Sequence, residues 1–154
     1  MEVRIVKASI DDMELLMEWR MRVLHEVFSV PADDTMAKLE AQNRTYYQTS
    51  LPADGHIACF AYKGDTIVGC GGVCLYQEMP SPDNENGKCA YLMNIYTLPE
   101  YRRQGIGKCI VNWLISEAKQ RGSTKIFLET SESGKSMYRK LGFSDMKEYM
   151  QFGK

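Results

Sequence analysis

The chain has 154 residues, the length of one ordinary domain, so we expect a single domain over residues 1–154. Hydrophobic residues make up 44% and charged residues 25% of the chain, a balance that excludes a disordered or fibrous protein. Nineteen Lys and Arg against 20 Asp and Glu leave a formal net charge of -1. This charge indicates no overall basic surface, so we expect no nucleic-acid partner.

The N-terminal residues and the cysteines bear on the cell compartment. No apolar run reaches the roughly 18 residues that span a bilayer, and no basic segment with a following apolar stretch begins the chain. Five cysteines without framework spacing predict no disulfide scaffold, and two histidines without neighbouring ligands predict no metal site. We expect a cytoplasmic protein without a membrane partner. The sequence leaves open whether the protein forms a homodimer.

The first third of the chain shows one strand and two helices. Val3–Lys7 is a short apolar strand. Ser9 and Asp12 have the spacing of a capping box, which predicts a helix that continues at helical spacing to Phe28. A second helix is predicted from about Met36 to Gln48, before a turn at Pro52–Gly55.

The middle of the chain is typical of antiparallel strands. Ile57–Tyr62 and Thr66–Tyr76 are apolar runs joined by the short turn at residues 63–65, which is a hairpin signal. The polar segment Pro80–Gly87 predicts a loop, and the apolar run Ala90–Leu98 predicts a third strand of this group.

The last third alternates helix and strand. A long amphipathic helix opens at Gly105, and a strand follows at Ile126–Glu129. Ser133–Leu141 predicts a short helix, and Tyr149–Phe152 predicts an edge strand. This order of elements predicts an α+β (α/β-like) fold, a sheet with helices on both faces.

The turn before the long helix is the segment with the clearest chemistry. It reads Arg102-Arg103-Gln104-Gly105-Ile106-Gly107-Lys108 and follows an apolar strand directly. Glycines let backbone N–H groups approach a phosphate, and a helix N-terminus attracts anions. These features favour a phosphate site over a solvated basic turn, whereas three cations are too few for an RNA-binding face.

Two common phosphate loops do not match this turn. A P-loop requires glycine where Arg102 stands and Ser or Thr where Cys109 stands. A dinucleotide fingerprint requires glycine where Ile110 stands. We therefore exclude both motifs.

Two motifs resemble those of the GNAT-type N-acetyltransferase family. Arg102, Gly105 and Gly107 match its R/Q-x-x-G-x-G/A signature. The segment from Ser131 to Phe143, SESGKSMYRKLGF, is similar to the family's second cofactor segment. The order of elements matches as well, so the resemblance covers nearly the whole chain. It implies a single mixed, mostly antiparallel central sheet with helices on both faces.

The resemblance implies acetyl-CoA as the acyl donor and a primary amine as the acceptor, with direct transfer and no acyl-enzyme. Backbone amides from Arg103 to Lys108 would hold the pyrophosphate, and the pantetheine arm would pair with Ile95–Thr97, where that strand parts from Ile126–Glu129. Tyr138 would protonate the leaving thiolate. The implied cofactor-binding residues are Ile95, Tyr96, Thr97, Arg102, Arg103, Gln104, Gly105, Ile106, Gly107, Lys108, Ser131 and Ser133.

The sequence departs from the family pattern at the second segment and at the base. Ser131 and Gly134 stand where the family often has Asn and Ala, and Tyr91 stands where many members have a glutamate. These departures leave a non-catalytic acyl-CoA-binding or sensor module as the alternative, although Tyr138 is retained. By itself, Tyr138 is also consistent with a core aromatic.

No carboxylate lies on the strand Ala90–Leu98, so the general base has to lie elsewhere. Glu129 and Glu78 at strand ends are candidates, and Tyr91 or a water chain is a further route for the proton. Arg20 and His25 on the first helix could line the acceptor site, although a polar helix face also explains them. Polyamines, aminoglycosides, amino acids and protein N-termini all stay open as acceptors.

Overall fold

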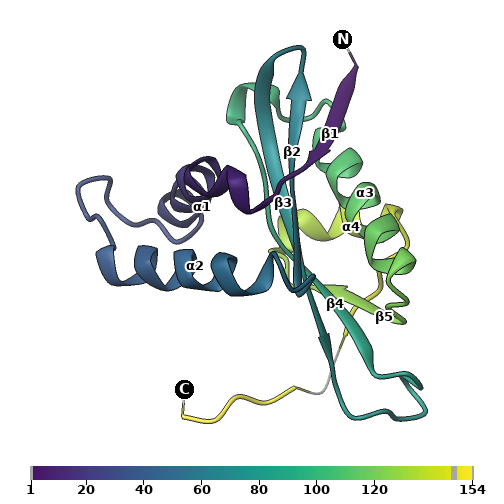
Figure 1. The fold of residues 1–154 in the computed structure, drawn as a ribbon. Helices are drawn as coiled ribbons and strands as arrows, with labels where there is room; N and C mark the ends of the chain where they lie inside the picture. The colour runs from purple at the N-terminus through teal and green to yellow at the C-terminus, as the bar shows by residue number, and fades with distance from the viewer. Residues whose placement is uncertain (1, 147–148, 154) are drawn as a thin grey trace.

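The computed structural model describes residues 2–146 and 149–153 and contains one five-stranded sheet between two layers of helices (Figure 1). The strands are β1 (Val3–Lys7), β2 (His56–Lys63), β3 (Thr66–Gln77), β4 (Lys88–Thr97) and β5 (Lys125–Leu128). The helices are α1 (Met13–Val27), α2 (Ala37–Ser50), α3 (Ile106–Gln120) and α4 (Lys135–Lys140), with 3-10 turns at Ile10–Asp12, Pro99–Tyr101 and Glu132–Gly134.

The strands lie in chain order, β1-β2-β3-β4-β5. The first four pair antiparallel with their neighbours, and only β4 and β5 are parallel. The expected mixed, mostly antiparallel sheet with helices on both faces is confirmed. Within the described ranges, no helix is long and apolar enough to cross a membrane.

The predicted capping box forms at the first helix. Ser9 Oγ accepts a hydrogen bond from the Asp11 N–H (3.2 Å), and Asp12 Oδ2 accepts one from the Ser9 N–H (2.8 Å). These bonds satisfy N–H groups that a helix start leaves without partners. The result is a 3-10 turn that leads into α1.

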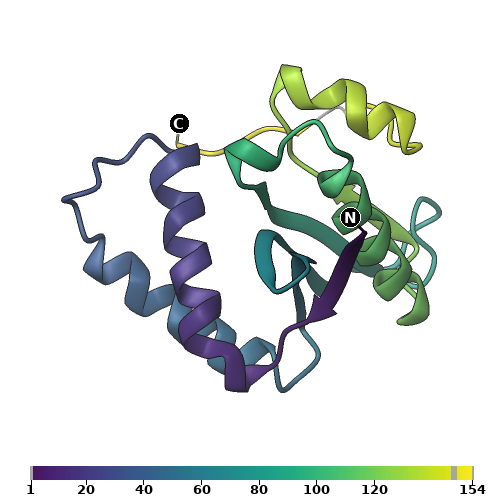
Figure 2. The same cartoon turned by 90° about the horizontal axis from the view of Figure 1, so that it is seen from above.

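Two hydrophobic cores cover the two faces of the sheet, because successive residues of a strand point to opposite faces. On β2, Ile57 and Cys59 pack towards α3, whereas Ala58 and Phe60 pack towards α1 and α2. Figure 2 shows α1 and α2 on one side of the sheet and α3 on the other. The α3 face contributes its buried residues Ile106, Ile110, Val111, Leu114 and Ala118.

A β-bulge interrupts β4 close to its end. Cys70 pairs with Tyr96 and Gly72 pairs with Met93, so two residues of β4, Asn94 and Ile95, lie opposite a single residue of β3. Asn94 has a φ of 58°, in the left-handed region, which a β-bulge accommodates. The bulge bends β4 and changes the direction of its side chains at this point.

The parallel strands β4 and β5 pair over only part of their length. Cys89 to Leu92 pair with Lys125 to Leu128, and beyond Leu92 the edge of β4 that faces β5 has no partner among the described strands. A Cβ on Gly69, which lies opposite Thr97, would stand 3.5 Å from Ile106 Cγ2. The first turn of α3 therefore lies beside the unpaired end of β4.

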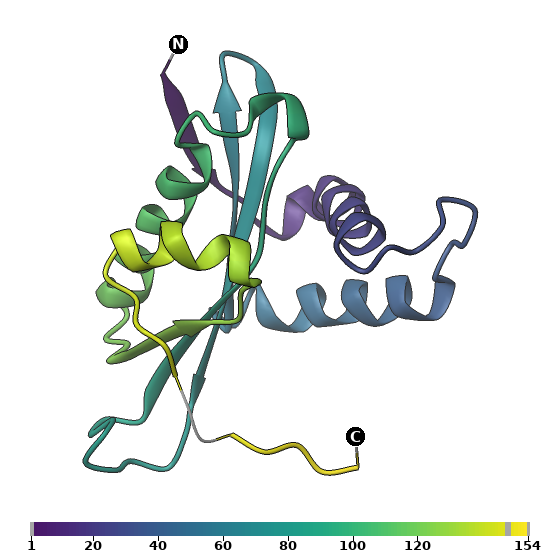
Figure 3. The same cartoon turned by 180° about the vertical axis from the view of Figure 1, so that it is seen from behind.

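The edge strand predicted at Tyr149–Phe152 is wrong. The described residues 149–153 form no strand, and they extend beneath α2 away from the sheet (Figure 3). Met150 and Phe152 are fully exposed. Tyr149 lines the same cavity as β5 residues, but residues 149–153 do not pair with that strand. An alternating apolar pattern becomes a strand only where hydrogen bonds to a neighbouring edge form.

Candidate active site

The loop before α3 leaves backbone donors free at the helix N-terminus. Gly105 takes a left-handed conformation (φ 82°) as the N-cap residue, and α3 has no side-chain cap. The first helical hydrogen bond runs from the Cys109 N–H to the Gly105 carbonyl (3.1 Å). The N–H groups of Ile106, Gly107 and Lys108 precede it, so they are available to an anion.

The three cations of this loop differ in their surroundings. Arg103 and Lys108 are exposed, and neither forms an ion pair within the described part of the chain. Arg102 donates from Nη2 to Glu26 Oε2 (3.0 Å) and from Nε to the Thr97 carbonyl (2.9 Å). Arg102 therefore joins the loop to α1 and to the end of β4, and its charge is neutralised there.

Gln104, Ser131 and Ser133, also expected at the cofactor site, are exposed residues that form side-chain hydrogen bonds. Gln104 Oε1 accepts a hydrogen bond from Lys63 Nζ (2.5 Å) at the end of β2. The Ser131 and Ser133 hydroxyls lie 3.0 Å apart in the turn before α4. The chain thus places them at the ends of neighbouring elements rather than in the core.

The residues expected to pair with pantetheine lie on the unpaired part of β4. Tyr96 is buried against Trp19 of α1, with ring centroids 6.2 Å apart, and Ile95 packs on the opposite face. The side chains of these two residues are therefore anchored in the two cores. The unpaired backbone edge of Ile95–Thr97 lies on the side of β4 that faces β5.

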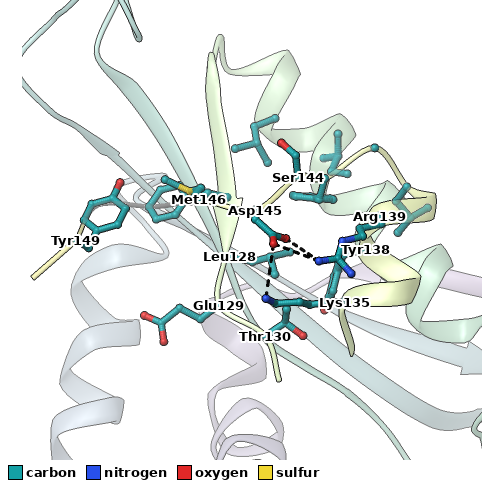
Figure 4. Close-up of a pocket in the computed structure, with 16 residues that line it drawn as sticks. Leu128, Glu129, Thr130, Lys135, Tyr138, Arg139, Ser144, Asp145, Met146 and Tyr149 are labelled. Carbon is teal, nitrogen blue, oxygen red and sulfur yellow. Dashed lines mark hydrogen bonds and ion pairs between the residues drawn. The ribbon is translucent and has the colours of Figure 1, made fainter. Parts of the chain in front are cut away.

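Tyr138 on α4 is half-buried beside a cavity of about 670 Å³ (Figure 4). Its ring packs edge-on against Phe143, with 5.7 Å between the centroids. Burial raises the pKa of Tyr138 above its usual value. Its hydroxyl therefore keeps its proton at neutral pH, as a general acid requires.

Tyr91 and Glu129 come together at the junction of β4 and β5. Tyr91 lies opposite Phe127 in the register, with 5.1 Å between the ring centroids. Burial raises the pKa of Tyr91, and the charge of the nearby Glu129 carboxylate raises it further. Glu129 is exposed, and Figure 4 shows its carboxylate pointing away from Tyr138.

Glu78, the other candidate base, lies at the opposite end of the β4–β5 pair. Its carboxylate accepts hydrogen bonds from Lys125 Nζ, 3.1 Å from Oε1, at the paired end of β5. The hydrogen bond from Lys125 lowers the pKa of Glu78. Both its position and its lowered basicity argue against a role as the base.

A second cavity, of about 280 Å³, lies between the sheet and the helices α1 and α2. Arg20 donates from Nε to Asn43 Oδ1 of α2 (2.9 Å) and from Nη1 to Asn94 Oδ1 of the β4 bulge (3.0 Å). Of the two α1 candidates, Arg20 lines this cavity, whereas a ring nitrogen of His25 lies 3.1 Å from the Val30 carbonyl. The lining residues are Arg20, Asn43, Tyr46, Tyr47, His56, Cys74, Met93 and Asn94.

His56 is buried at one wall of this second cavity. Its Nδ1 lies 2.8 Å from the Tyr46 hydroxyl, which in turn lies 3.1 Å from Cys74 Sγ. Burial lowers the pKa of His56 to about 4, so the imidazole is neutral at pH 7. His56, Tyr46 and Cys74 were not predicted as site residues. A histidine directly before one apolar strand and an asparagine inside another were the signals for this cavity.

In this fold an open parallel strand pair lies beside an uncapped helix N-terminus. Residues 13–143 match the family described as "Acetyltransferase (GNAT) family", and the chain belongs to this family.

A crystal structure of a predicted acetyltransferase with acetyl-CoA from Clostridium acetobutylicum is similar over 99% of this chain and 96% of that chain. The TM-score is 0.87 and the identity 27%.

Two curated relatives match shorter stretches. An uncharacterized N-acetyltransferase, YsnE, of Bacillus subtilis (strain 168) is 26% identical over 98 residues, which are 60% of this chain. The [ribosomal protein bS18]-alanine N-acetyltransferase of Escherichia coli (strain K12) is 37% identical over 59 residues, 36% of this chain. The matches span 59% and 40% of the lengths of these two relatives.

Proposed function

We propose that this protein is an N-acetyltransferase that moves the acetyl group of acetyl-CoA directly to a primary amine. The observation that carries the proposal is the unpaired β4 edge at Ile95–Thr97, which lies beside the uncapped N-terminus of α3. One surface thus offers a strand edge for an amide-bearing arm and N–H donors for a diphosphate. The similar Clostridium acetobutylicum structure holds acetyl-CoA, which supports this donor.

The α3 loop has room for a diphosphate against its backbone. A Cβ on Gly105 would have no neighbour within 4 Å, and one on Gly107 would contact Met137 alone, 3.6 Å from Sδ. In the proposed complex the N–H groups of residues 103–108 bind the pyrophosphate, with Arg103 and Lys108 adding charge. In the same proposed complex, Ser131 and Ser133 contact the cofactor beyond the pyrophosphate.

Tyr138, Tyr91 and Glu129 supply the proton transfers in the proposed reaction. The amine attacks the thioester carbon while the backbone of β4 orients the donor, which is catalysis by proximity. Tyr138 gives its proton to the sulfur as the carbon–sulfur bond breaks. Tyr91 and Glu129 hold the water through which the amine loses its proton to solvent.

Direct transfer fits the state of the cysteines better than an acyl-enzyme. Cys74 is the cysteine that contacts a histidine, with 3.6 Å between Sγ and His56 Nδ1. Burial raises the pKa of the Cys74 thiol, so it carries little thiolate at pH 7. Cys109 is exposed on α3, and burial raises the pKa of Cys89. None of the three is an activated nucleophile.

The state of the cysteines also supports a location in the cytoplasm. All five cysteines are free thiols, which suits a reducing compartment.

The binding step can be tested by calorimetry with CoA. CoA and acetyl-CoA should bind with one site per chain and more weakly at high salt, whereas pantetheine alone should compete poorly. Gly107→Glu places a negative charge at the pyrophosphate and should abolish binding. Gly107→Ala adds only the contact with Met137 and should retain it. No heat with CoA at millimolar concentration would overturn the proposal.

The transfer step can be tested by acetyl-CoA-dependent thiol release across amine classes. We expect at least one class of small amine or peptide to accelerate release, with the acetylated amine identified by mass spectrometry. Stoichiometric CoA binding without acetylation of any amine would instead favour the acyl-CoA-binding module.

A further inference from the structure

Arg20 brings an uncompensated positive charge to the wall of the second cavity. Its two hydrogen bonds go to the amide oxygens of Asn43 and Asn94, which carry no formal charge. Across residues 2–146 and 149–153, no Asp or Glu forms an ion pair with it. Two of the five guanidinium donors are used, so donors remain for a bidentate partner.

No other lining residue of the cavity neutralises the charge of Arg20. No Asp or Glu is among its lining residues. His56 is neutral at pH 7, and Tyr46, Tyr47 and Cys74 keep their protons because burial raises the pKa of each. The cavity therefore has a net charge of about +1, which repels a simple alkylammonium ion and attracts an anion.

The cavity also lies where an acceptor would have to be. Met93 and Asn94 form part of its wall, and they are the first two residues of β4 beyond the pairing with β5. The β4 edge proposed to hold the donor begins at the next residue, Ile95. A molecule bound to Arg20 thus lies beside the gap, and a volume of about 280 Å³ admits only a small one.

We propose that Arg20 binds a carboxylate of the acceptor, so that the acceptors are small amines that carry a carboxylate, in the class of free amino acids. This inference rests on the proposed acetyl transfer. The carboxylate neutralises the cavity, and the bidentate geometry holds the amine at a fixed distance from the bulge. The asparagines on either side of Arg20 orient its guanidinium without cancelling its charge.

The test compares matched acceptors with the wild-type chain. The probes are the standard L-amino acids and β-alanine, each beside its carboxamide, measured by thiol release and by calorimetric binding to the CoA-loaded chain. We expect the best amino acid to exceed its carboxamide by about 10- to 100-fold in kcat/KM and in affinity, the range of a charge-assisted hydrogen bond. A carboxamide releases its amine proton more readily, so amine basicity does not explain such a preference.

Two variants of Arg20 separate its charge from its shape. Arg20→Gln removes the charge, and Arg20→Lys keeps the charge but lacks the bidentate guanidinium. Arg20→Gln should abolish the difference between acid and amide, and Arg20→Lys should retain part of it. A purely structural role would lower the rates with both members of a pair equally. The matched control is Arg22→Gln, because Arg22 lies on the same helix, stacks on Trp19 at 4.4 Å and does not line the cavity.

The outcomes separate this inference from the proposed function. Amino acids that bind through Arg20 without thiol release would overturn acetyl transfer and leave the carboxylate site standing. Equal or better rates with carboxamides or alkylamines would overturn the carboxylate site and leave acetyl transfer standing.

Discussion

Arg102, before α3, and Glu26, in the last turn of α1, form an ion pair with 3.0 Å between Nη2 and Oε2. This contact joins the proposed pyrophosphate loop to the helix that also carries Arg20. The residue that opens the signature motif therefore acts on the loop through α1, while Lys108 keeps an exposed charge for the ligand.

The first prediction follows from this division of roles. Lys108→Gln should weaken CoA binding by about fivefold, the upper end for an exposed charge pair. Arg102→Gln should weaken it less, and should lower the free energy of unfolding by up to about 1 kcal/mol as the pair with Glu26 is lost. Calorimetry and urea unfolding measure the two effects. A larger loss of affinity for Arg102→Gln would show that Arg102 leaves Glu26 to bind phosphate.

Tyr138→Phe should lower kcat by ~10²-fold, within the range for one general acid, with CoA affinity unchanged. The phenylalanine keeps the packing on Phe143, so stability should change little. The measurements are steady-state thiol release with an identified acceptor and calorimetry with CoA. Unchanged turnover would assign Tyr138 to packing alone.

Glu129→Gln should reduce kcat/KM by less than ~10²-fold, because a water shared with Tyr91 also carries the proton. Glu78→Gln is the matched control, since Glu78 is bound to Lys125 at the far end of the strand pair, and its effect should be negligible. An amine acceptor is largely protonated at neutral pH, so the rate should rise with pH through neutrality as the free amine increases. A ~10³-fold loss for Glu129→Gln would identify Glu129 as the base.

Stability should fall on mild acidification because of His56. Its pKa is about 4 in the folded chain against 6.5 for a free side chain, so below pH 6.5 the unfolded chain binds a proton that the folded chain excludes. The free energy of unfolding should therefore drop by about 2 kcal/mol between pH 7 and pH 5. Urea unfolding at these two pH values measures the drop. His56→Gln should lose most of this pH dependence; an unchanged slope would show that His56 is protonated in the folded state.

Short-range rules predicted most elements of this protein correctly from the sequence. The capping box at Ser9, the hairpin at residues 63–65 and the helix that opens at Gly105 each depend on residues within a few positions of one another. Their physical causes are N–H capping, strand alternation and the left-handed conformation that glycine tolerates. The loop before α3 followed from the same local order, whereas the gap between β4 and β5 was implied by the resemblance to the family.

The tertiary structure alone decided what lies beside these elements. Arg102 meets Glu26 across 76 positions of the chain, and Arg20 meets Asn94 across 74. Three further features depend on the same packing. They are the bulge that directs Asn94 towards Arg20, the burial that keeps His56 neutral, and the course of residues 149–153 outside the sheet. Such contacts depend on how helices and sheet pack together, and sequence spacing carries no information about distances across that interface.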